Sequence, residues 1–350
     1  MINKNIPINK GNYSLDTTER EKEFERKRGL GHEKEYQQNR KEWTEFAKSQ
    51  YIADYPLLVD IELASLCNLK CPMCYTITKE FKKLVNATLM DFELFKKIVD
   101  EIAGKVFAIR LSLRGESTLH PKFVDAIRYA KEKGIKEVSS LTNGSKLKGD
   151  YARKVIEAGI DWITFSIDGI NETYEKIRKP TKFAQIMSNL EEIKRIKAEL
   201  NTEKPVIKIQ GIWPAIEENP SEYYNKLAPS SDLMAFNPLI DFSYPIPLDQ
   251  IEYEENFSCA QLYQRLVVGA DGKVMMCAND DENQHVIGDA NKETIHEIWH
   301  GENLNKVREI HKKNDGFKEI AVCQKCYLPR KTKEDIFEIN GRALIVKNYV

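Results

Sequence analysis

The sequence predicts an α/β fold, in which a parallel sheet with crossover helices is followed by a smaller cysteine-bearing region. Short β-type runs alternate with helical repeats from Tyr55 onward, and Gly134 and Gly159 stand where helix C-caps are expected. Strict alternation with right-handed crossovers makes neighbouring strands parallel. The seven cysteines form two groups, one directly after the first strand and one near the C-terminus. Periodicity alone fits either an open six-stranded barrel or a doubly wound open sheet.

The first expected element is helical. Residues 13–50 are polar and rich in lysine and glutamate, and their aromatic residues are spaced for one or two amphipathic helices broken near Gly29 and Gly31. We expect this N-terminal extension, residues 1–54, to pack against the exterior or an open edge of the barrel. A dimer contact and a substrate-recognition helix are the alternatives.

Six strands and their crossover helices are expected in residues 55–245. Apolar residues recur at helical spacing between the β-type runs, and a later glycine, Gly272, marks a hairpin turn. The expected strands are 57–63, 106–113, 137–141, 162–167, 206–212 and 233–236; the helical repeats lie at 92–102, 123–130, 155–156 and 183–196; and the hairpin joins 264–268 to 274–276.

Composition excludes several classes of protein. Lys+Arg 53 balance Asp+Glu 54, so no global basic field indicates nucleic acid as a partner. No apolar run is long enough to span a membrane, and the polar opening Met1–Lys4 has no signal-peptide h-region. We therefore expect a soluble cytoplasmic protein, in which grouped cysteines indicate metal rather than disulfides.

The first cysteine group is a C-x3-C-x2-C loop formed by Cys67, Cys71 and Cys74. Three thiolates on one short loop can hold three irons of a cubane cluster and leave the fourth iron open to chemistry. A structural zinc site needs four closed ligands, and the nearest histidines in sequence are His32 and His120. A disulfide pair needs an oxidising compartment, which the absence of a signal peptide disfavours.

This loop, with its interposed Pro72-Met73 and its place after a first strand, resembles the cluster loop of the radical SAM superfamily. The resemblance implies a partial (β/α)6 TIM-type barrel over residues 55–245 rather than a doubly wound sheet. It also implies a 4Fe-4S cluster whose open iron is chelated by the amino and carboxylate groups of S-adenosyl-L-methionine. One electron, from a flavodoxin or ferredoxin type donor, then cleaves the sulfonium to a 5'-deoxyadenosyl radical.

The ends of the expected strands supply candidate cofactor contacts, because functional groups of parallel barrels collect there. Arg114-Gly115-Glu116 resembles the family's Gly-Gly-Glu motif for the methionine ammonium, with arginine in place of the first glycine; a solvated turn is the alternative. Met73 stands at the family position whose backbone contacts adenine, so the resemblance implies this contact for Met73. The full candidate set is Met73, Gly115, Glu116, Asn143, Ser166, Asp168 and Gln210.

The fourth and fifth strand ends resemble the family less specifically. Ser166 and Asp168 lie in a Ser-x-Asp-Gly sequence similar to that of SPASM-type enzymes, where the serine faces the ribose; Asp168 can equally cap the next helix. Asn143 follows the third strand. Gln210 can reach cofactor or substrate, or act as a structural polar residue at the barrel rim.

The second cysteine group comprises Cys259, Cys277, Cys323 and Cys326. The pattern C-x12-G-x4-C with a later C-x2-C resembles the first part of the SPASM motif, and residues 294–299 resemble the helix between its cysteines. The chain has no cysteine after the fourth, which resembles the twitch variant with one auxiliary 4Fe-4S cluster in residues 246–350. A zinc ribbon is the alternative, although C-x17-C is a loose pair for zinc. A fully ligated cluster is suited to electron transfer.

These sites predict a radical SAM enzyme that abstracts hydrogen from a small polar substrate: a sugar, nucleotide sugar or aminocyclitol. With the auxiliary cluster as electron acceptor the reaction is an oxidation, as in the 2-deoxy-scyllo-inosamine dehydrogenases that the architecture resembles. Arg114, His120, Arg178 and Asp241 are the candidate bases, although His120 before Pro121 fits a helix-entry residue as well. The alternatives are redox-neutral sugar dehydration or epimerisation, a peptide-modifying maturase, and a non-enzymatic zinc-binding scaffold.

Overall fold

The computed structural model describes residues 4–8, 10, 13–238 and 247–349. Six parallel strands form its centre, and their order across the sheet is the order in the chain. A doubly wound sheet requires a reversal of strand order, so this sequential order selects the partial barrel. The strands are β2 (Leu58–Ile61), β3 (Ala108–Arg110), β4 (Glu137–Thr142), β5 (Trp162–Ser166), β6 (Val206–Ile212) and β7 (Leu233–Asn237).

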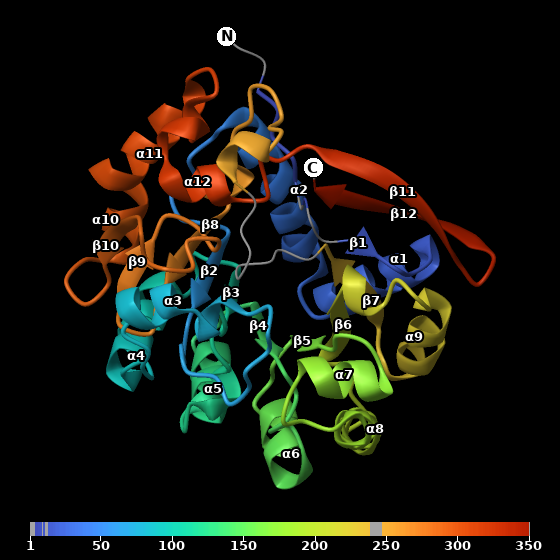
Figure 1. The fold of residues 1–350 in the computed structure, drawn as a ribbon. Helices are drawn as coiled ribbons and strands as arrows, with labels where there is room; N and C mark the ends of the chain where they lie inside the picture. Colours follow the sequence, from blue (N-terminus) through green and yellow to red (C-terminus); the bar gives the residue numbers. More distant parts are fainter. Residues whose placement is uncertain (1–3, 9, 11–12, 239–246, 350) are drawn as a thin grey trace.

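Helices cover the outer face of the sheet (Figure 1). Alternate strand residues on that face are apolar and fully buried, for example Val59, Ile109 and Ile209, because they pack against the apolar stripes of the crossover helices. Gly134 and Gly159 follow helix ends with φ of 88° and 90°, which confirms the expected C-caps. These helices are α4 (Phe92–Ile102), α5 (Phe123–Glu132), α6 (Gly149–Glu157), α7 (Asn171–Ile177) and α8 (Phe183–Glu199).

The sheet extends beyond the barrel at both edges. The predicted hairpin is present, with Gly272 at φ 84° in its turn, but its first strand pairs in parallel with β2 and so continues the barrel sheet. At the other edge β1 (Tyr13–Ser14) pairs antiparallel with β7. The local periodicity of the sequence predicts neither of these two strand pairings. The added strands are β8 (Arg265–Val268), β9 (Lys273–Met275) and β10 (Val286–Asp289).

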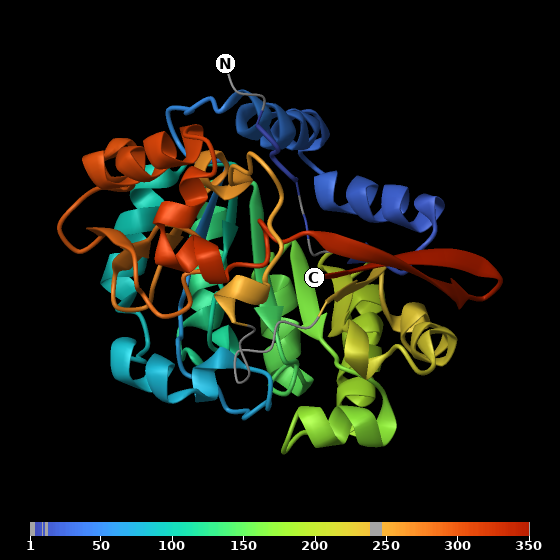
Figure 2. The ribbon, with the colours of Figure 1, turned by 45° about the horizontal axis from the view of Figure 1, so that its top comes forward.

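Two helices form the N-terminal extension, as predicted: α1 (Thr18–Gly29) and α2 (Glu33–Ser49). They lie beside the N-terminal ends of the strands (Figure 2). Arg28 pairs with Glu137, the first residue of β4, and the backbone carbonyl of Trp43 accepts a hydrogen bond from Gln264, just before β8. The expectation of packing on the exterior or an open edge is therefore refined, because the two helices close the end of the barrel opposite the cysteine loop.

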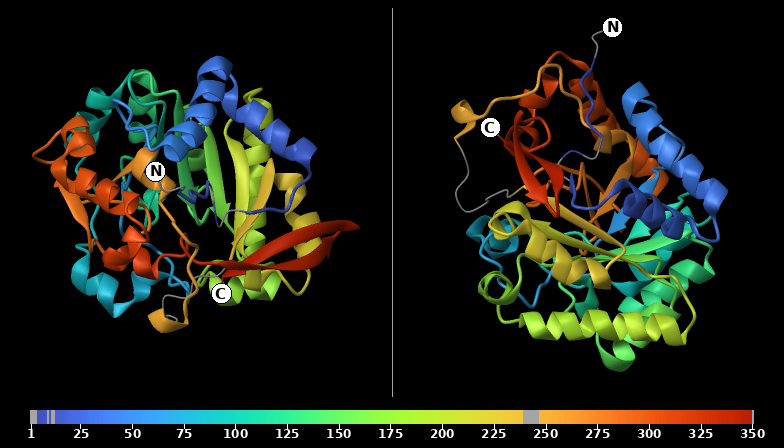
Figure 3. Two further views of the ribbon diagram at one scale, coloured as in Figure 1. Left: turned by 90° about the horizontal axis from the view of Figure 1, so that it is seen from above. Right: turned by 90° about the vertical axis from the view of Figure 1, so that its right-hand side faces the viewer.

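The remaining elements surround the barrel. α10 begins with a capping box between Thr294 and Glu297, which confirms the expected helix. A C-terminal hairpin that the sequence did not predict extends along α9 (Figure 3), where Phe337 packs edge-on to Trp213. No helix in the described ranges is both long and apolar enough to cross a membrane. These elements are α3 (Lys79–Leu84), α9 (Pro220–Leu227), α10 (Ile295–His300), α11 (Glu302–Lys312), α12 (Ala321–Lys325), β11 (Thr332–Ile339) and β12 (Arg342–Tyr349).

Candidate functional site

The first cysteine loop lies at the C-terminal end of β2. Its three cysteines are free thiols, with Cys67 exposed, Cys74 half-buried and Cys71 buried. Burial raises the pKa of Cys71 to about 11, against the opposing charge of Arg178, so a thiolate here needs further positive charge. The backbone N–H of Leu69 donates to Cys67 Sγ at 3.4 Å, a contact typical of cluster sulfurs. This donor set fits a three-ligand iron–sulfur site.

Gly115 brings the end of the second barrel strand against this loop. A Cβ at this position would lie 2.3 Å from the carbonyl oxygen of Ala64 and 2.5 Å from that of Leu66, so only glycine fits. The next residue, Glu116, donates its backbone N–H to Leu66 O at 2.8 Å. This close approach fixes the Arg114-Gly115-Glu116 turn to the residues directly before Cys67.

Glu116 is buried and its carboxylate accepts four hydrogen bonds. Thr118 donates its backbone N–H and its hydroxyl, at 3.3 and 2.6 Å, and the hydroxyl of Thr142 donates at 2.7 Å. The backbone N–H of Asn143 donates to the second carboxylate oxygen at 2.7 Å. These donors satisfy the buried carboxylate of Glu116 and come from the segments that follow β3 and β4, so Glu116 links the ends of the two strands. It therefore does not lie in a solvated turn.

Asn143 also holds the cluster loop through its side chain. Its Nδ2 donates to Asn68 Oδ1 at 2.9 Å, and Asn68 Nδ2 donates to the hydroxyl of Ser145 at 3.0 Å. Asn68 lies between the first two cysteines of the loop and was not among the predicted site residues. The only sequence signal for it was its position inside the motif.

Ser166 and Gln210 lie opposite each other in the β5–β6 register, and both are half-buried. Asp168, two residues after Ser166, accepts hydrogen bonds from Arg178 Nε at 2.6 Å and from the N–H of Ile212 at 3.0 Å. It does not cap α7, whose N-cap has no side-chain bond. Asp168 therefore links the ends of β5 and β6 and positions Arg178, whose charge acts on the buried thiol of the first loop.

Of the candidate bases, His120 has both ring nitrogens engaged by backbone. Nε2 contacts the carbonyl of Met90 at 2.9 Å and therefore carries the proton, while Nδ1 accepts from the N–H of Lys122 at 3.1 Å. This arrangement supports the helix-entry alternative. Asp241 lies outside the described residues. Met73 is half-buried within the cysteine loop.

Arg114 forms a buried ion pair with Glu62, with side chains 1% and 0% exposed and an Nη2 to Oε2 distance of 2.6 Å. Burial opposes the charge of Arg114, but the hydrogen bonds that Arg114 donates to Glu62 and the charge of Glu62 outweigh it and raise the pKa of Arg114. Arg178 behaves similarly beside Asp168, where its pKa is raised. Both guanidiniums therefore stay protonated. They serve as fixed positive charges in their ion pairs and do not accept a proton.

The ion pair also reaches the second cysteine region. Arg114 Nη1 donates to Asn283 Oδ1 at 2.6 Å and to the carbonyl of Asp281 at 3.3 Å. Burial raises the pKa of the Asp281 carboxyl to about 7, against the lowering effect of Arg114. The charge of Asp281 acts on Tyr75, next to the first loop, and on Cys326. Glu62 and Asp281 were missed in sequence, because only folding brings them to Arg114.

The second cysteine group is assembled from residues far apart in the chain. Cys259, Cys277 and Cys323 are buried and Cys326 is half-buried. Burial raises the pKa of Cys259 to about 12, and burial together with the charges of the other three thiols raises that of Cys277. Asn279 Nδ2 and the N–H of Leu328 donate to Cys326 Sγ at 3.3 and 3.4 Å. Four converging, desolvated thiols fit a fully ligated metal centre.

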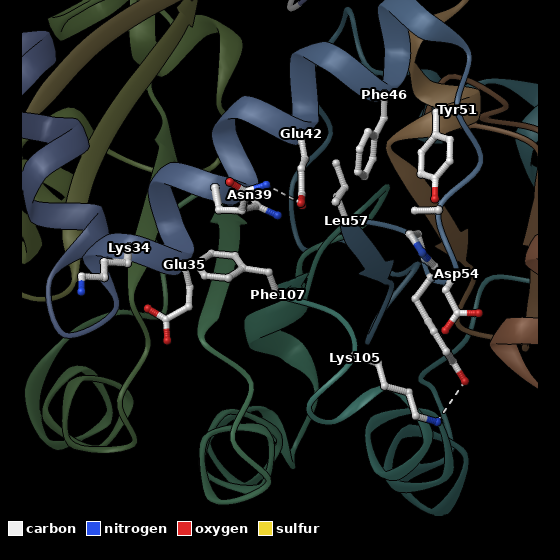
Figure 4. Close-up of a pocket in the computed structure, with 14 residues that line it drawn as sticks. Lys34, Glu35, Asn39, Glu42, Phe46, Tyr51, Asp54, Leu57, Lys105 and Phe107 are labelled. Carbon is white, nitrogen blue, oxygen red and sulfur yellow. Dashed lines mark hydrogen bonds between the residues drawn. The ribbon is translucent and has the colours of Figure 1, made fainter.

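A surface pocket of about 540 Å³ lies between α2 and the segment before β2 (Figure 4). Its lining includes Leu57 and Phe107, which precede β2 and β3, and Lys105 donates a hydrogen bond to the hydroxyl of Tyr55 at 3.0 Å. The pocket therefore lies at the N-terminal ends of the strands, away from the cysteine loop. The candidate active site is at the other end.

The sequence matches two family models. Residues 61–202 match the radical SAM superfamily, and residues 259–327 match the iron–sulfur cluster-binding domain called SPASM. The chain therefore belongs to the radical SAM superfamily. Its C-terminal region is a SPASM domain, which binds iron–sulfur in addition to the 4Fe-4S cluster and S-adenosyl-L-methionine of the radical SAM domain. The chain thus carries the domain of radical SAM enzymes together with a SPASM domain.

Curated relatives match less than half of the chain. The tungsten-containing aldehyde ferredoxin oxidoreductase cofactor-modifying protein of Pyrococcus furiosus is 28% identical over 153 residues, 43% of this chain and 42% of the relative. A probable GTP 3',8-cyclase of Methanococcus maripaludis is 32% identical over 137 residues, 39% of this chain and 42% of the relative. The matched segments span less than half the length of these relatives.

Solved structures show the same fold over more of the chain. BtrN in complex with AdoMet and 2-DOIA is similar with a TM-score of 0.52 at 17% identity, covering 77% of this chain and 92% of BtrN. Native anSMEcpe with bound AdoMet gives a TM-score of 0.56 at 16% identity, and the match covers 78% of this chain and 88% of anSMEcpe. SuiB of Streptococcus suis is similar with a TM-score of 0.56 at 14% identity, and the match covers 83% of this chain and 77% of SuiB. These likenesses confirm the partial barrel with a C-terminal SPASM region.

Proposed function

We propose that this enzyme oxidises an alcohol carbon of a small polar substrate, a sugar, nucleotide sugar or aminocyclitol, and that the four-cysteine site receives the electron. One observation carries the proposal: the strand that follows the first of these four cysteines pairs directly with β2, whose end bears the three-cysteine loop. A single sheet therefore supports both sites. Rigid elements position redox groups better than loops do.

The group at the first site would be held by Cys67, Cys71 and Cys74. When bound and reduced by a flavodoxin or ferredoxin type donor, the cluster and S-adenosyl-L-methionine supply a 5'-deoxyadenosyl radical, which takes a hydrogen atom from the substrate. Glu116 and Asn143 would contact the bound S-adenosyl-L-methionine.

The chain must then remove the hydroxyl proton and one electron from the substrate radical. Asp281 is the candidate base that we favour among the described residues, because its pKa of about 7 leaves it partly ionised at neutral pH. It lies next to Arg114, which bridges the two cysteine regions. The four thiols at Cys259, Cys277, Cys323 and Cys326 would fully ligate an auxiliary 4Fe-4S cluster, and the electron would pass to that cluster.

The likeness to BtrN supports a small-molecule substrate, whereas the curated relatives include a cyclase, so redox-neutral dehydration or epimerisation is the second candidate. The test is anaerobic incubation of reconstituted enzyme with reductant, S-adenosylmethionine and panels of sugars, nucleotide sugars and aminocyclitols, read by mass spectrometry. Loss of two hydrogens supports oxidation. Loss of water, or an unchanged mass with inverted stereochemistry, refutes oxidation, and a modified peptide in a parallel panel refutes the small-molecule class.

A further inference from the structure

A buried histidine lies within the four-cysteine site. His311, in the last turn of α11, is 0% exposed, and its ring packs edge-on to Phe257 with the ring centroids 6.3 Å apart. Nδ1 lies 3.3 Å from the backbone nitrogen of Cys259, and Nε2 lies 3.5 Å from Cys323 Sγ. His311 therefore links two of the four cysteines, one 52 positions before it in the chain and one 12 positions after it.

These two contacts fix the tautomer of the His311 ring. The backbone N–H of Cys259 is a donor, so Nδ1 is the accepting nitrogen and carries no proton. A neutral imidazole whose Nδ1 accepts has its proton on Nε2. The Nε2–H group therefore donates to Cys323 Sγ, and the contacts with Phe257 and the backbone of Cys259 hold the ring in this orientation.

The other three cysteines of the site each have a backbone N–H donor two residues further along the chain. Burial raises the pKa of these thiols, and hydrogen bonds from those N–H groups oppose that effect. Such donors depend on the conformation of the chain and not on residue type. The cysteine and donor pairs are Cys259 with Gln261, Cys277 with Asn279, and Cys326 with Leu328.

Cys323 differs from these three cysteines because it lies inside a helix, α12. Backbone N–H groups within a helix donate to carbonyls of the preceding turn. The N–H groups of Cys323 and Gln324 both donate to Ile320 O, at 2.9 and 3.1 Å, so they are not available to the sulfur. Among the residues that the structure describes, His311 supplies to Cys323 Sγ the hydrogen bond that the backbone supplies to the other three sulfurs.

An N–H donor to a ligating sulfur changes how readily an iron–sulfur group accepts an electron. The added electron makes the sulfurs more negative, and a hydrogen bond to a more negative acceptor is stronger. The donor therefore stabilises the reduced form more than the oxidised form, which raises the reduction potential.

We propose that His311 is a positioning residue that acts through Cys323 and raises the reduction potential of the group held by the four cysteines. This inference rests on the proposed function, in which that group receives one electron from the substrate radical while Asp281 takes the hydroxyl proton. His311 keeps its own proton throughout, so the electron and the proton of the oxidation are both accounted for without it.

The test is a potentiometric titration, followed by electron paramagnetic resonance, of reconstituted protein in which Cys67, Cys71 and Cys74 are alanine, so that only the second site is loaded. We expect His311→Phe to lower the reduction potential by about 59 mV, which is a tenfold change in the one-electron equilibrium. His311→Gln keeps an amide N–H donor and should lower the potential by less than half as much. His300→Phe, at an exposed position of α10, is the matched control and should leave the potential unchanged.

A shift in His311→Phe no larger than that in the control overturns the inference. Where neither His311 variant folds, as judged by iron content and unfolding temperature, the same protein without a His311 change is prepared with histidine that carries a heavy nitrogen isotope. Pulsed electron paramagnetic resonance of the reduced second site should then show coupling to a histidine nitrogen, and its absence overturns the inference.

The proposed function is checked separately, by mass spectrometry of oxidised product from protein with an intact first loop. A lowered potential in His311→Phe, with no oxidised product from the wild type, supports the role of His311 and refutes the oxidation. An unchanged potential with normal oxidised product refutes the role of His311 alone. Zinc in place of iron at the second site refutes both.

Discussion

Replacing Gly115 by alanine tests the contact that joins the second barrel strand to the cysteine loop. The new Cβ would lie 2.3 Å from Ala64 O, 2.5 Å from Leu66 O and 2.6 Å from the carbonyl carbon of Ser65. All three are backbone atoms, so no side chain can rotate away. Real Cβ atoms essentially never come closer than 3.0 Å to such neighbours, so the two segments must separate by at least 0.7 Å.

The displaced segment leads directly into Cys67, and Glu116 is bonded to it through Leu66 O. A misplacement near 1 Å at a catalytic site lowers rates roughly 100-fold, and overpacking costs about 1–3 kcal/mol of stability. We therefore expect Gly115→Ala to reduce uncoupled 5'-deoxyadenosine formation about 100-fold. Because the four-cysteine site is not touched, at least half of the iron should remain.

The assay is anaerobic cofactor cleavage with reductant and S-adenosylmethionine, read by liquid chromatography, with iron analysis of the same sample. Gly29→Ala is the matched control, because its Cβ would lie no closer than 3.1 Å to its nearest neighbour, the Tyr36 side chain, at the other end of the barrel. Wild-type cleavage by Gly115→Ala would refute the reasoning, since it would mean that the cluster loop tolerates the displacement.

Four further predictions concern the site. Changing the three cysteines of the first loop to alanine should lower bound iron from about eight to about four per chain and abolish 5'-deoxyadenosine formation. Changing Cys323 and Cys326 to alanine should preserve uncoupled cleavage but sharply reduce oxidised product. Arg114→Met should lower the free energy of unfolding by about 3–5 kcal/mol, because it leaves the buried carboxylate of Glu62 unpaired. Asp281→Asn should remove a rise in oxidation rate with pH that is centred near pH 7, since the carboxyl accepts a proton only when ionised, above its pKa of about 7.

The last three of these predictions have their own checks. Zinc in place of iron at the second site would contradict the electron-acceptor role, as would normal oxidation without Cys323 and Cys326. Arg26→Met, on an exposed pair, is the control for Arg114 and should change stability little. An unchanged pH profile in Asp281→Asn would remove Asp281 as the base and leave its neighbours to be tested.

The sequence predicted the elements well because strands and helices follow local periodicity. All six barrel strands were expected within a few residues of their observed bounds. The hairpin at Gly272 was expected as well, and so were one or two helices broken near Gly29 and Gly31. The cysteine motif was equally local, since three ligands of one site stand within eight residues.

Other features of the site depend on contacts between distant residues. Arg114 was expected at the barrel mouth as a base, but Glu62, 52 positions earlier, turns it into the fixed cation of a buried pair. His120 was a candidate by residue type, and only the carbonyl of Met90, 30 positions away, shows that its ring is already engaged. No local sequence pattern predicts hydrogen-bond partners of this kind, because they depend on the register of neighbouring strands.

By itself, the sequence determined the class of fold and the grouping of the cysteines, because hydrophobic periodicity and cysteine spacing act within short segments. The tertiary structure decided three things: that the strands are sequential and form a partial barrel, that the SPASM hairpin continues the same sheet beside β2, and that α1 and α2 close its far end. The physical reason is strand pairing. Backbone hydrogen bonds between strands are the same for any residue type, so pairing over long separations is set by how the whole chain packs.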